Sequence, residues 1–451
     1  MSPNRTDDEK GPCDHSESPN RTPTCEHLAG PLTWGVKYYQ WMTGHGLDKV
    51  LVCGECLERL EAGTQITPTS ICDDCLDVLE HDLGDLEGVR GTPEIKVDWR
   101  SMDESLMLTQ LPFGADEIVD LAPIEREAAA WLLLLTDGSM HRVHVETGEV
   151  TRVCTIHLPP EEPDHEPWNG HVLRVSLHVS PDGAFAAVVH DYGKMGRVYE
   201  LRTGTATMEL HCGNYHPETV PFSFAFVERR GRTVAIHRTD WHRLEASDAA
   251  TGDLLTARAS TVWRRGEPRP EHFADYFHGR LMVSPDGRKV LDDGWVWHPV
   301  GVPKFWDIDV WLDSNVWESE DGMGRITLTA RDDYWDHGLC WIDSDRIAVG
   351  GIGDRDWVML DGVRCFSTEV MPSYWIDVRN ARELDAFAGP SGIFFSDGER
   401  LFSSCTDGLS VWDVEGKALT ARIEGFIPSK QHIRDRELVQ LSGSTLSRWR
   451  Y

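Results

Sequence analysis

Four cysteines near the start of the chain have the spacing of metal ligands. Cys53 and Cys56 form one Cys-x-x-Cys pair, and Cys72 and Cys75 form a second pair after fifteen intervening residues. A gap of two residues lets both sulfurs of a pair point at one ion, and the loop between the pairs lets the second pair complete a tetrahedron. This spacing predicts a structural Zn²⁺ site that stabilises a small domain and leaves no coordination position open for catalysis.

Two Cys-x-His pairs precede these cysteines and leave the ligand set open. Cys25 and His27 are candidate additional ligands, which would either join the first cluster or contribute to a second site. Cys13 and His15 lie among Ser, Pro, Asn and Asp residues, so a second metal site and an incidental pair in a disordered tail are the alternatives. Two disulfides are the alternative for Cys53, Cys56, Cys72 and Cys75, but the chain shows no secretory signal that would favour them.

The region around these cysteines is strongly acidic. Residues 1–94 contain 18 acidic and 7 basic side chains, a formal charge of −11. Zinc ribbons that bind nucleic acid need a basic surface, so we expect this module to contact protein instead. Over this fragment the order of Cys and His resembles the ubiquitin-binding zinc fingers of deubiquitinases, although the later His ligands of that family have no counterpart here.

The rest of the chain repeats one pattern at intervals near fifty residues. An apolar run ends in a Ser/Asp turn, a second apolar run follows, and an Asp-centred turn precedes a third run. The clearest copies begin at Val179-Ser180-Pro181-Asp182-Gly183, Val283-Ser284-Pro285-Asp286-Gly287, Ile342-Asp343-Ser344-Asp345 and Phe395-Ser396-Asp397-Gly398, and they reach Asp191, Asp293, Asp356 and Asp407. This period and internal order predict four-stranded sheets arranged radially, each burying its faces on its neighbours.

These motifs resemble the WD-repeat family over residues 115–423. The resemblance rests on the Ser-Pro-Asp-Gly turn, the Asp of the middle turn, and Trp412-Asp413 at the end of a third strand. It implies a β-propeller that presents its rim and faces to other macromolecules, usually without catalysis. Most of the repeats lack the terminal Trp-Asp, so the family's hydrogen-bond relay is expected only in the best copy.

We therefore predict a mainly all-β chain with a seven-bladed β-propeller, six to eight blades being the range, and a small N-terminal zinc-binding domain. The predicted parts are a disordered acidic tail (1–24), a zinc-ribbon-like module (25–84), a linker (85–94) and a WD-like propeller (95–451). Residues 430–451 supply only about two good strands. Apolar segments such as Leu106–Leu111 are expected to complete this last blade and close the ring without an exposed edge.

Tryptophans mark two candidate partner-binding regions. Trp306, Trp311 and Trp317 lie in a long excursion of the fourth blade, and loop insertions in repeat proteins often carry the binding face. Trp168 and Trp335 belong to aromatic and histidine clusters that precede two blades and are expected on one face of the propeller. In both regions the alternative is that the rings are buried and stabilise the blades.

Charge and motif content limit the function classes. A net charge of −31 opposes nucleic acid and anionic membranes, and the longest apolar stretch, Ala128 to Leu135, is too short to cross a bilayer. We expect a cytoplasmic protein that binds one or more proteins. No phosphate loop or nucleophile elbow is present, which favours a non-catalytic scaffold or adaptor. The alternative is a propeller-type hydrolase or lyase with its site at the channel mouth.

Overall fold

The chain forms two compact units. The computed structural model describes residues 9–10, 21–33, 35–43, 48–72, 75–76, 78–79, 84–90, 95–101, 106–159, 170–263, 266–352, 359–371 and 380–451. One unit comprises Met1–Val97, Gly351–Arg364 and Asp385–Pro390, and the other comprises Asp98–Gly350, Cys365–Leu384 and Ser391–Tyr451. The amino-terminal module lies within the first 97 residues, and six sheets follow it among the described residues, one of them a ten-stranded sheet that contains two blades.

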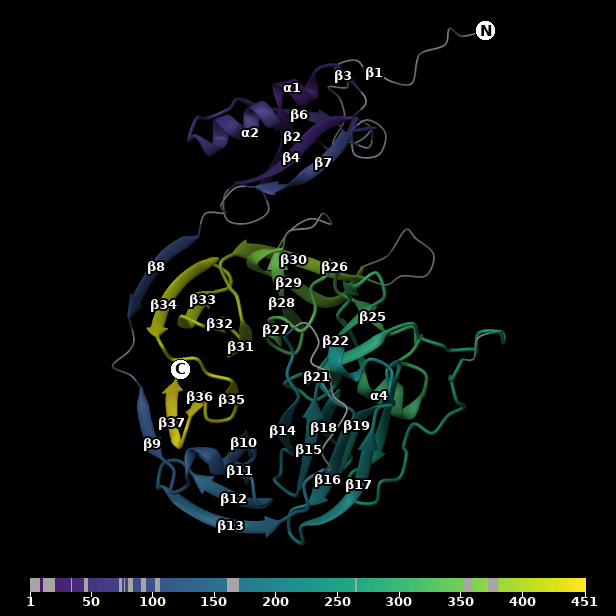
Figure 1. Ribbon diagram of the computed structural model, residues 1–451, viewed down its shortest axis with the longest axis vertical. Helices are drawn as coiled ribbons and strands as arrows, with labels where there is room; N and C mark the ends of the chain where they lie inside the picture. The colour runs from purple at the N-terminus through teal and green to yellow at the C-terminus, as the bar shows by residue number, and fades with distance from the viewer. Residues whose placement is uncertain are drawn as a thin grey trace. The chain divides into compact units, whose positions relative to one another are not determined.

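A mixed five-stranded sheet with two short helices makes up the amino-terminal module (Figure 1). Its strand order is β6-β2-β5-β4-β7, in which β2 is parallel to β5 but antiparallel to β6. The elements are β2 (Arg21–Cys25), α1 (Glu26–Ala29), β4 (Val36–Thr43), β5 (Asp48–Cys53), α2 (Gly54–Glu61), β6 (Pro68–Cys72) and β7 (Gly84–Arg90), and β1 (Glu9–Lys10) pairs with β3 (Leu32–Thr33). The helices follow β2 and β5 directly, so the ends of these two strands set the positions of the helix starts.

The segment predicted as a linker contains a strand. β7 runs through residues 84–90 and pairs in parallel with β4, from Val36↔Gly84 to Trp41↔Arg90. Glycines at three positions suggested a break in structure, but pairing with β4 satisfies the backbone hydrogen bonds of this segment. Residues 91–94, like residues 1–8 and 11–20 of the predicted tail, lie outside the described residues.

The sheets that follow are antiparallel and mostly four-stranded, as blades of a propeller require. The first three blades are β10 (Ile118–Pro123), β11 (Ala130–Leu135), β12 (Ser139–His144) and β13 (Glu149–Thr155); β14 (Arg174–Val179), β15 (Phe185–Asp191), β16 (Met195–Glu200) and β17 (Thr205–His211); and β18 (Phe224–Arg229), β19 (Arg232–Asp240) and β20 (Arg243–Asp248). A single bridge, Ser247↔Leu254, stands where the fourth strand of the third blade is expected.

The fourth and fifth blades are the most elaborate. They contain β21 (Phe277–Val283), β22 (Lys289–Val296), β24 (Lys304–Asp307) and β25 (Ile326–Thr327), then β27 (Leu339–Trp341), β28 (Arg346–Ile352), β29 (Leu360–Met371) and β30 (Asn380–Ala388). A parallel bridge between β25 and β30 joins the two sheets at their outer strands. The fourth blade also carries the short strands β23 (Val300–Gly301) and β26 (Arg331–Asp332) and the helix α4 (Ile308–Asp313).

Strands from the start of the domain complete the last two blades. The sixth blade is β31 (Ile393–Ser396), β32 (Arg400–Cys405), β33 (Gly408–Asp413) and β34 (Ala418–Glu424), and β8 (Lys96–Ser101) adds to its outer edge. The seventh is β35 (Lys430–His432), β36 (Glu437–Ser442), β37 (Thr445–Arg450) and β9 (Met107–Gln110). The β37–β9 pairing, Thr445↔Gln110 to Arg448↔Met107, confirms the predicted closure. Closure covers an edge that would otherwise pair with other chains.

The inner strands lie next to one another around a centre (Figure 1). β10 is adjacent to β35 and β14, β18 to β14 and β21, and β27 to β31. This radial order distinguishes a propeller from a layered sandwich, and it agrees with seven blades among the described residues.

The repeated turns have the same hydrogen bonds in different blades. Between β14 and β15, Ser180 Oγ donates to Asp182 (2.7 Å) and accepts from the backbone N–H of Phe185 (2.9 Å). Between β21 and β22, Ser284 makes the equivalent bonds to Asp286 (2.6 Å) and Lys289 (2.9 Å). The glycine that ends each turn has a φ near +70°, a conformation in which glycine carries no steric penalty.

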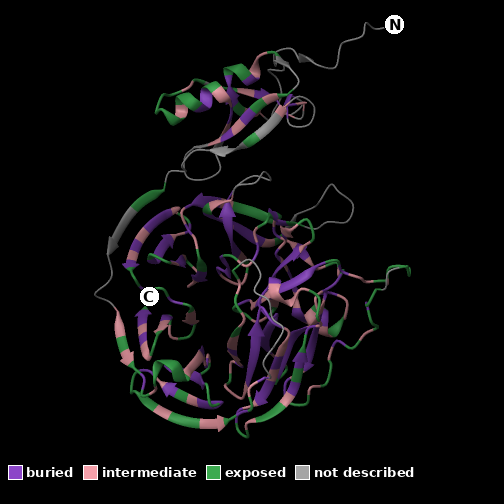
Figure 2. Ribbon diagram, viewed as in Figure 1, coloured by how far each residue is buried: buried purple, intermediate pink, exposed green. Residues whose placement is uncertain are grey.

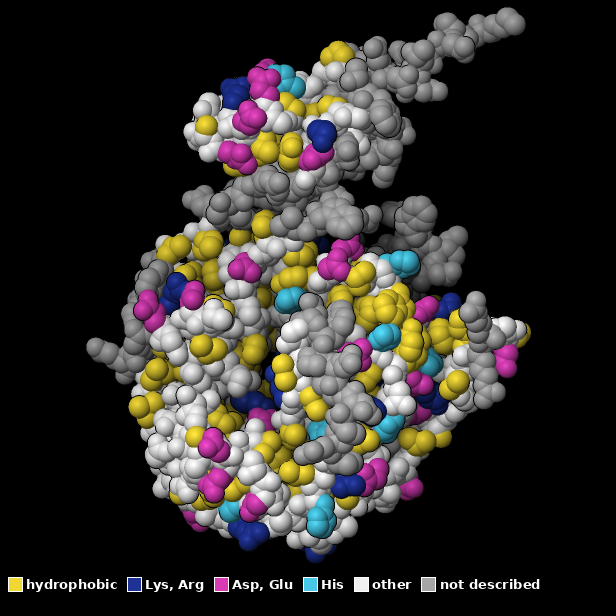
Figure 3. Space-filling model, in the orientation of Figure 1, with side chains coloured by type: hydrophobic (Ala, Val, Ile, Leu, Met, Phe, Trp, Pro, Cys, Tyr) yellow, Lys and Arg dark blue, Asp and Glu magenta, His cyan; other side chains and the backbone are white. Residues whose placement is uncertain are grey.

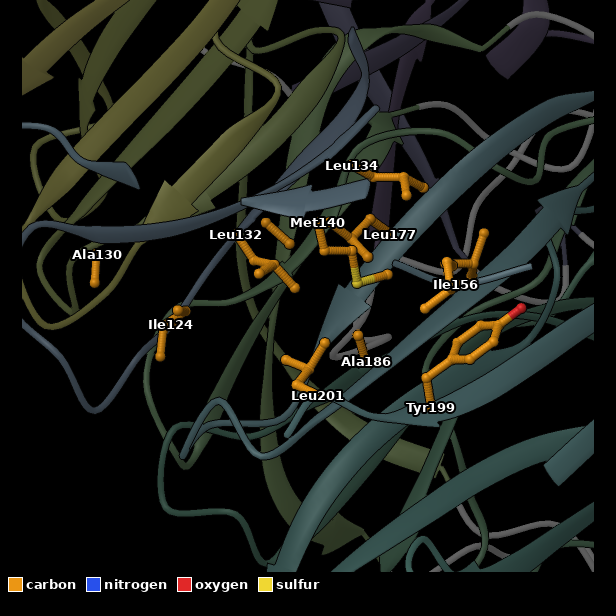
Figure 4. Close-up of a cluster of buried hydrophobic side chains, with 12 residues drawn as sticks. Ile124, Ala130, Leu132, Leu134, Met140, Ile156, Leu177, Ala186, Tyr199 and Leu201 are labelled. Carbon is orange, nitrogen blue, oxygen red and sulfur yellow. The ribbon is translucent and has the colours of Figure 1, made fainter. Parts of the chain in front are cut away.

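The hydrophobic core is divided among the interfaces between blades. Figure 4 shows one such cluster, where Leu132, Leu134 and Met140 of the first blade meet Leu177 and Tyr199 of the second. Similar clusters lie between the second and third, third and fourth, fourth and fifth, sixth and seventh, and seventh and first blades. The buried side chains follow the blades in Figure 2. Each fully buried Leu or Phe contributes about 1.5–3 kcal/mol, so the blades stabilise one another mainly by packing.

Candidate functional site

The parallel pair β2–β5 brings two cysteines together. Thr24 of β2 pairs with Leu51 of β5, so the two strands end side by side at Cys25 and Cys53. α1 begins directly after Cys25 and carries His27, and α2 begins directly after Cys53 and carries Cys56 in its first turn. Two strand ends and two helix starts therefore place four ligand-type side chains at one point of the module.

The four side chains form a compact group. One ligand atom from each of Cys25, His27, Cys53 and Cys56 lies within 4.8 Å of all the others. His27 Nδ1 is 3.3 Å from the sulfur of Cys53 and 3.3 Å from that of Cys56, and the Cys53 backbone N–H donates to Cys25 Sγ at 3.4 Å. Sulfurs held 2.3 Å from one ion at tetrahedral angles are about 3.8 Å apart, so the group has the dimensions of a metal centre.

The electrostatics of the group favour a cation. Burial, with the nearby charges of Cys25 and Cys53 as smaller causes, raises the pKa of the Cys56 thiol to about 12. Burial also raises the pKa of Cys25. Cys25 and Cys56 are buried, while Cys53 and His27 are more exposed. A divalent cation among the three sulfurs would stabilise their thiolates. The residues present thus fit a metal ion of the kind that three Cys and one His bind.

This group differs from the predicted set of four cysteines. Cys53 and Cys56 belong to it, and the candidate additions Cys25 and His27 complete it, whereas Cys72 and Cys75 do not. Antiparallel pairing of β6 with β2 sets Cys72 opposite Arg21, while Cys25 is opposite Pro68. Cys72 and Pro68 are four residues apart along β6, so the position opposite Arg21 is about 13 Å from the position opposite Cys25. Cys72 and Cys75 are instead buried in the core of the module, and Cys13 and His15 lie outside the described residues.

Two of the predicted partner-contact tryptophans are buried. Trp306 and Trp311 are both 0% exposed and pack in the cluster between the third and fourth blades. The prediction that they contact a partner is therefore wrong: Trp306 lies in β24, α4 folds Trp311 against it, and their ring centroids are 6.0 Å apart. Trp317 is partly buried and stacks on His272 at 4.3 Å.

Of the two tryptophans in the clusters before the blades, Trp335 lies among the described residues and Trp168 does not. Trp335 is only 8% exposed and donates its ring N–H to the Thr219 carbonyl at 3.0 Å, so it supports the blades, which is the alternative that the sequence left open. In the related cluster at the start of β21, His278 is buried and bonds to Asp292 of β22 at 2.6 Å, which links two neighbouring strands of the blade.

An aromatic surface that the sequence reasoning missed lies above this buried layer. Tyr215, His216, Trp241 and Trp297 form it, and we call these four residues the aromatic surface. Tyr215 is 45% exposed and Trp297 is 43% exposed. Tyr215 packs against Trp241 at 5.3 Å, and His216 meets Trp297 edge-on at 5.4 Å. Trp297 follows β22 directly, at a turn between short strands, and this turn position is the signal that could have revealed its exposure.

A stack of buried rings supports the aromatic surface. Phe277 stacks on Trp295 at 4.3 Å, and Trp295 stacks on Trp335 at 4.7 Å. Trp297 contacts Phe277 and Trp295 at 5.6 and 5.1 Å. The exposed rings thus rest on a fixed base, and Figure 3 shows hydrophobic side chains and histidines gathered near β22 and β25.

A polar group also lies at one end of the inner strands. The Tyr192 hydroxyl donates to Asp336, and His171 stacks on Tyr192 at 4.5 Å and lies 4.0 Å from the Asp336 carboxylate. Burial and the charge of Asp336 raise the pKa of Tyr192. A proton acceptor or nucleophile at neutral pH needs the opposite shift, so these contacts fit a connection between loops better than catalysis.

Comparisons with known proteins found similarity to solved structures alone. No protein-family model matches the sequence, and no curated protein matches it. Among solved structures, a chain of the mitotic checkpoint complex is 14% identical, with a TM-score of 0.46, over 80% of this chain and 96% of that one. The β-propeller domain of Myceliophteria thermophila Cps50 (Swd1) is 13% identical, with a TM-score of 0.46, over 76% of this chain and 98% of that one.

The blades and their turns define the class of this protein. It is a β-propeller whose Ser-Asp turns resemble those of WD repeats, preceded in the chain by a module that carries a Cys/His group able to hold a metal. Among the described residues, no helix has the length and apolar character that crossing a bilayer requires.

Proposed function

We propose that this chain is a non-catalytic protein-interaction scaffold whose propeller binds a partner protein through the aromatic surface. The observation that carries the proposal is the exposure of Tyr215 and Trp297 above a rigid stack of buried rings. Tyr and Trp dominate the energetic centres of protein interfaces, because they bury a large area and lose little conformational entropy. A fixed base lowers that entropic cost further.

The charge of the chain indicates the kind of partner. With a net charge of −31, the chain attracts a basic protein surface over long range and repels an acidic one. The aromatic rings would supply most of the binding free energy, and the acidic surroundings would raise the association rate. Binding should therefore weaken as the salt concentration rises, mainly through slower association.

We also propose that the metal is a structural Zn²⁺ bound by Cys25, His27, Cys53 and Cys56. The support is the donor set, since three thiolates and one imidazole close a tetrahedral zinc site without an open position. In this role the ion would hold the starts of α1 and α2 against the ends of β2 and β5. Cys72 and Cys75 would then contribute buried side chains to the core of the module.

The partner proposal is tested by affinity capture followed by measurement with the purified partner. Replacing Tyr215 and Trp297 by Ala should weaken binding of the captured protein by about 100-fold, because each anchoring ring contributes about 1–2 kcal/mol. Leu108→Ala is the matched control, since Leu108 is 71% exposed but lies on β9 of the seventh blade. Equal binding by the double variant and the control would overturn the proposal.

A further inference from the structure

A second binding feature lies near the centre of the propeller. A cavity of about 560 Å³ is lined by the inner strands β21, β27 and β31 and by residues near the C-terminus. Much of its wall is apolar, with Met282, Leu339, Trp341, Ile342, Ile393 and Phe394 among its residues. Pockets of about 300–1,000 Å³ with apolar walls and a few polar groups are typical sites for small molecules. Figure 3 shows this centre as a hollow with Lys and Arg side chains inside it.

Three of the four charged residues on the cavity wall have partners of opposite charge. Asp343 pairs with Arg346 at 2.7 Å. Asp397 lies between Arg400 at 2.6 Å and Arg436 at 3.0 Å, and its side chain is only 1% exposed. Asp343 thus balances Arg346, while the single negative charge of Asp397 is shared between Arg400 and Arg436.

Arg280 is the exception among the described residues. Its guanidinium donates to the backbone carbonyl of His337 at 3.1 Å, but in the part of the chain that the structure describes no carboxylate lies within ion-pair distance, and its Nε is buried without a hydrogen-bond partner. The carboxylate opposite it in the sheet, Asp293, pairs with Arg331 at 3.0 Å instead. A buried donor without a partner costs about 1–3 kcal/mol, which an acceptor on a ligand would recover.

Arg280 lies on the same face of β21 as an apolar residue of the cavity wall. Side chains alternate along β21, so Arg280 and Met282 project to one face and Leu281 and Val283 to the other. Leu281 packs in the cluster between the third and fourth blades, whereas Met282 packs against the cluster of the fourth and fifth. One cation thus stands at the edge of an apolar wall.

We propose that this cavity binds a small apolar carboxylic acid, with its carboxylate on Arg280 and its apolar body against Met282, Leu339 and Phe394. A guanidinium holds a carboxylate through two parallel hydrogen bonds, and one unpaired cation matches one negative charge. A phosphate would bring more charge than the wall can neutralise. This site is independent of the aromatic surface and of the metal.

A larger cavity neighbours this one. It measures about 1080 Å³ and also borders Arg280, and most of its other cations have a carboxylate partner, although Arg434 donates only to the backbone carbonyl of Arg126. Arg174 lies 3.2 Å from Asp191, and Lys430 lies 2.9 Å from Asp120. Arg280 borders both cavities, and the apolar wall formed by Met282, Leu339 and Phe394 is what distinguishes the smaller one.

The test compares decanoate with decan-1-ol, which have the same chain length and differ in charge. Calorimetric titration into the full-length protein should show decanoate binding about tenfold tighter, because a charge-assisted pair adds about 1.5 kcal/mol. Arg280→Gln should reduce the affinity for decanoate to that for decan-1-ol and leave the alcohol unchanged. Ile393→Trp, at a residue that is 38% exposed on the cavity wall, should weaken both probes.

Arg434→Gln is the matched control, because Arg434 lines only the larger cavity. It should leave both affinities unchanged. Thermal unfolding of each variant shows whether it is folded. Binding of decanoate and of decan-1-ol to the unmodified protein can be compared even if a variant fails to fold. Any of three results would overturn the proposal. They are equal affinities of the unmodified protein for decanoate and decan-1-ol, no saturable binding of decanoate, or an equal loss of decanoate affinity in Arg434→Gln and Arg280→Gln.

Discussion

The amino-terminal module and the propeller are stabilised in different ways. Four of the eleven buried residues in the core cluster of the module are cysteines, Cys25, Cys56, Cys72 and Cys75. The interfaces between blades instead bury Leu, Val, Phe and Trp in cluster after cluster. A small domain with a small core needs a metal or a similar device, whereas a large ring of sheets is stable by packing alone. The two parts should therefore respond to different perturbations.

Metal removal should give the largest difference between the two parts. Chelation, or the variant Cys53→Ser, should unfold the module, because structural zinc supplies about 10 kcal/mol or more of folding free energy in such domains. Hydrogen exchange would show loss of protection in β2, β5 and α2 and unchanged protection in the blades. Loss of protection in both parts would contradict the comparison, and Cys405→Ser in β32 is the control for cysteine replacement.

Removal of a buried blade tryptophan should give the reverse pattern. Trp311→Ala should destabilise the propeller by about 3–5 kcal/mol, because it deletes a fully buried ring and leaves a cavity. Denaturant unfolding measures the loss, and the metal content per chain should not change. Trp263→Ala is the control, since Trp263 is 48% exposed and should cost far less. A similar cost for both variants would mean that Trp311 is not in the core.

Acid should weaken the propeller through its buried histidines. Burial lowers the pKa of His237 to about 4, from an ordinary value of 6.5. The unfolded chain therefore binds the proton more readily, so this stability is fully present above pH 6.5 and is lost as the pH falls toward 4, by about 3 kcal/mol.

His237→Gln should make the unfolding free energy less dependent on pH between 6.5 and 4, because Gln keeps a donor for Ser247 without taking up a proton. Unfolding curves at a series of pH values measure this slope. An unchanged slope would show that His237 does not contribute to the acid sensitivity.

Local repeats made much of the propeller predictable. Ser180 and Ser284 sit in turns whose hydrogen bonds are formed within a few residues, so their sequence alone determines the hairpin. The shortage of strands after residue 430 indicated that an early segment completes the last blade, and β9 does so. The addition of β8 to the sixth blade had no such signal, because nothing local specifies which outer edge it joins.

The metal group and the tryptophans were less predictable because they depend on long-range pairing. The spacing of Cys72 and Cys75 suits a metal, but the register of β6 against β2 places Cys72 at the far end from Cys25. No local pattern reports that register. Likewise, the excursion that holds Trp311 is long enough to form a binding loop, and only the packing of α4 shows that its ring is buried.

X-ray absorption on the purified full-length protein tests the central claim most directly, namely that the module is held by one ion on Cys25, His27, Cys53 and Cys56. The account predicts one zinc per chain with three sulfurs at about 2.3 Å and one nitrogen at about 2.0–2.1 Å. A shell of four sulfurs, or a folded module that contains no metal, would contradict it.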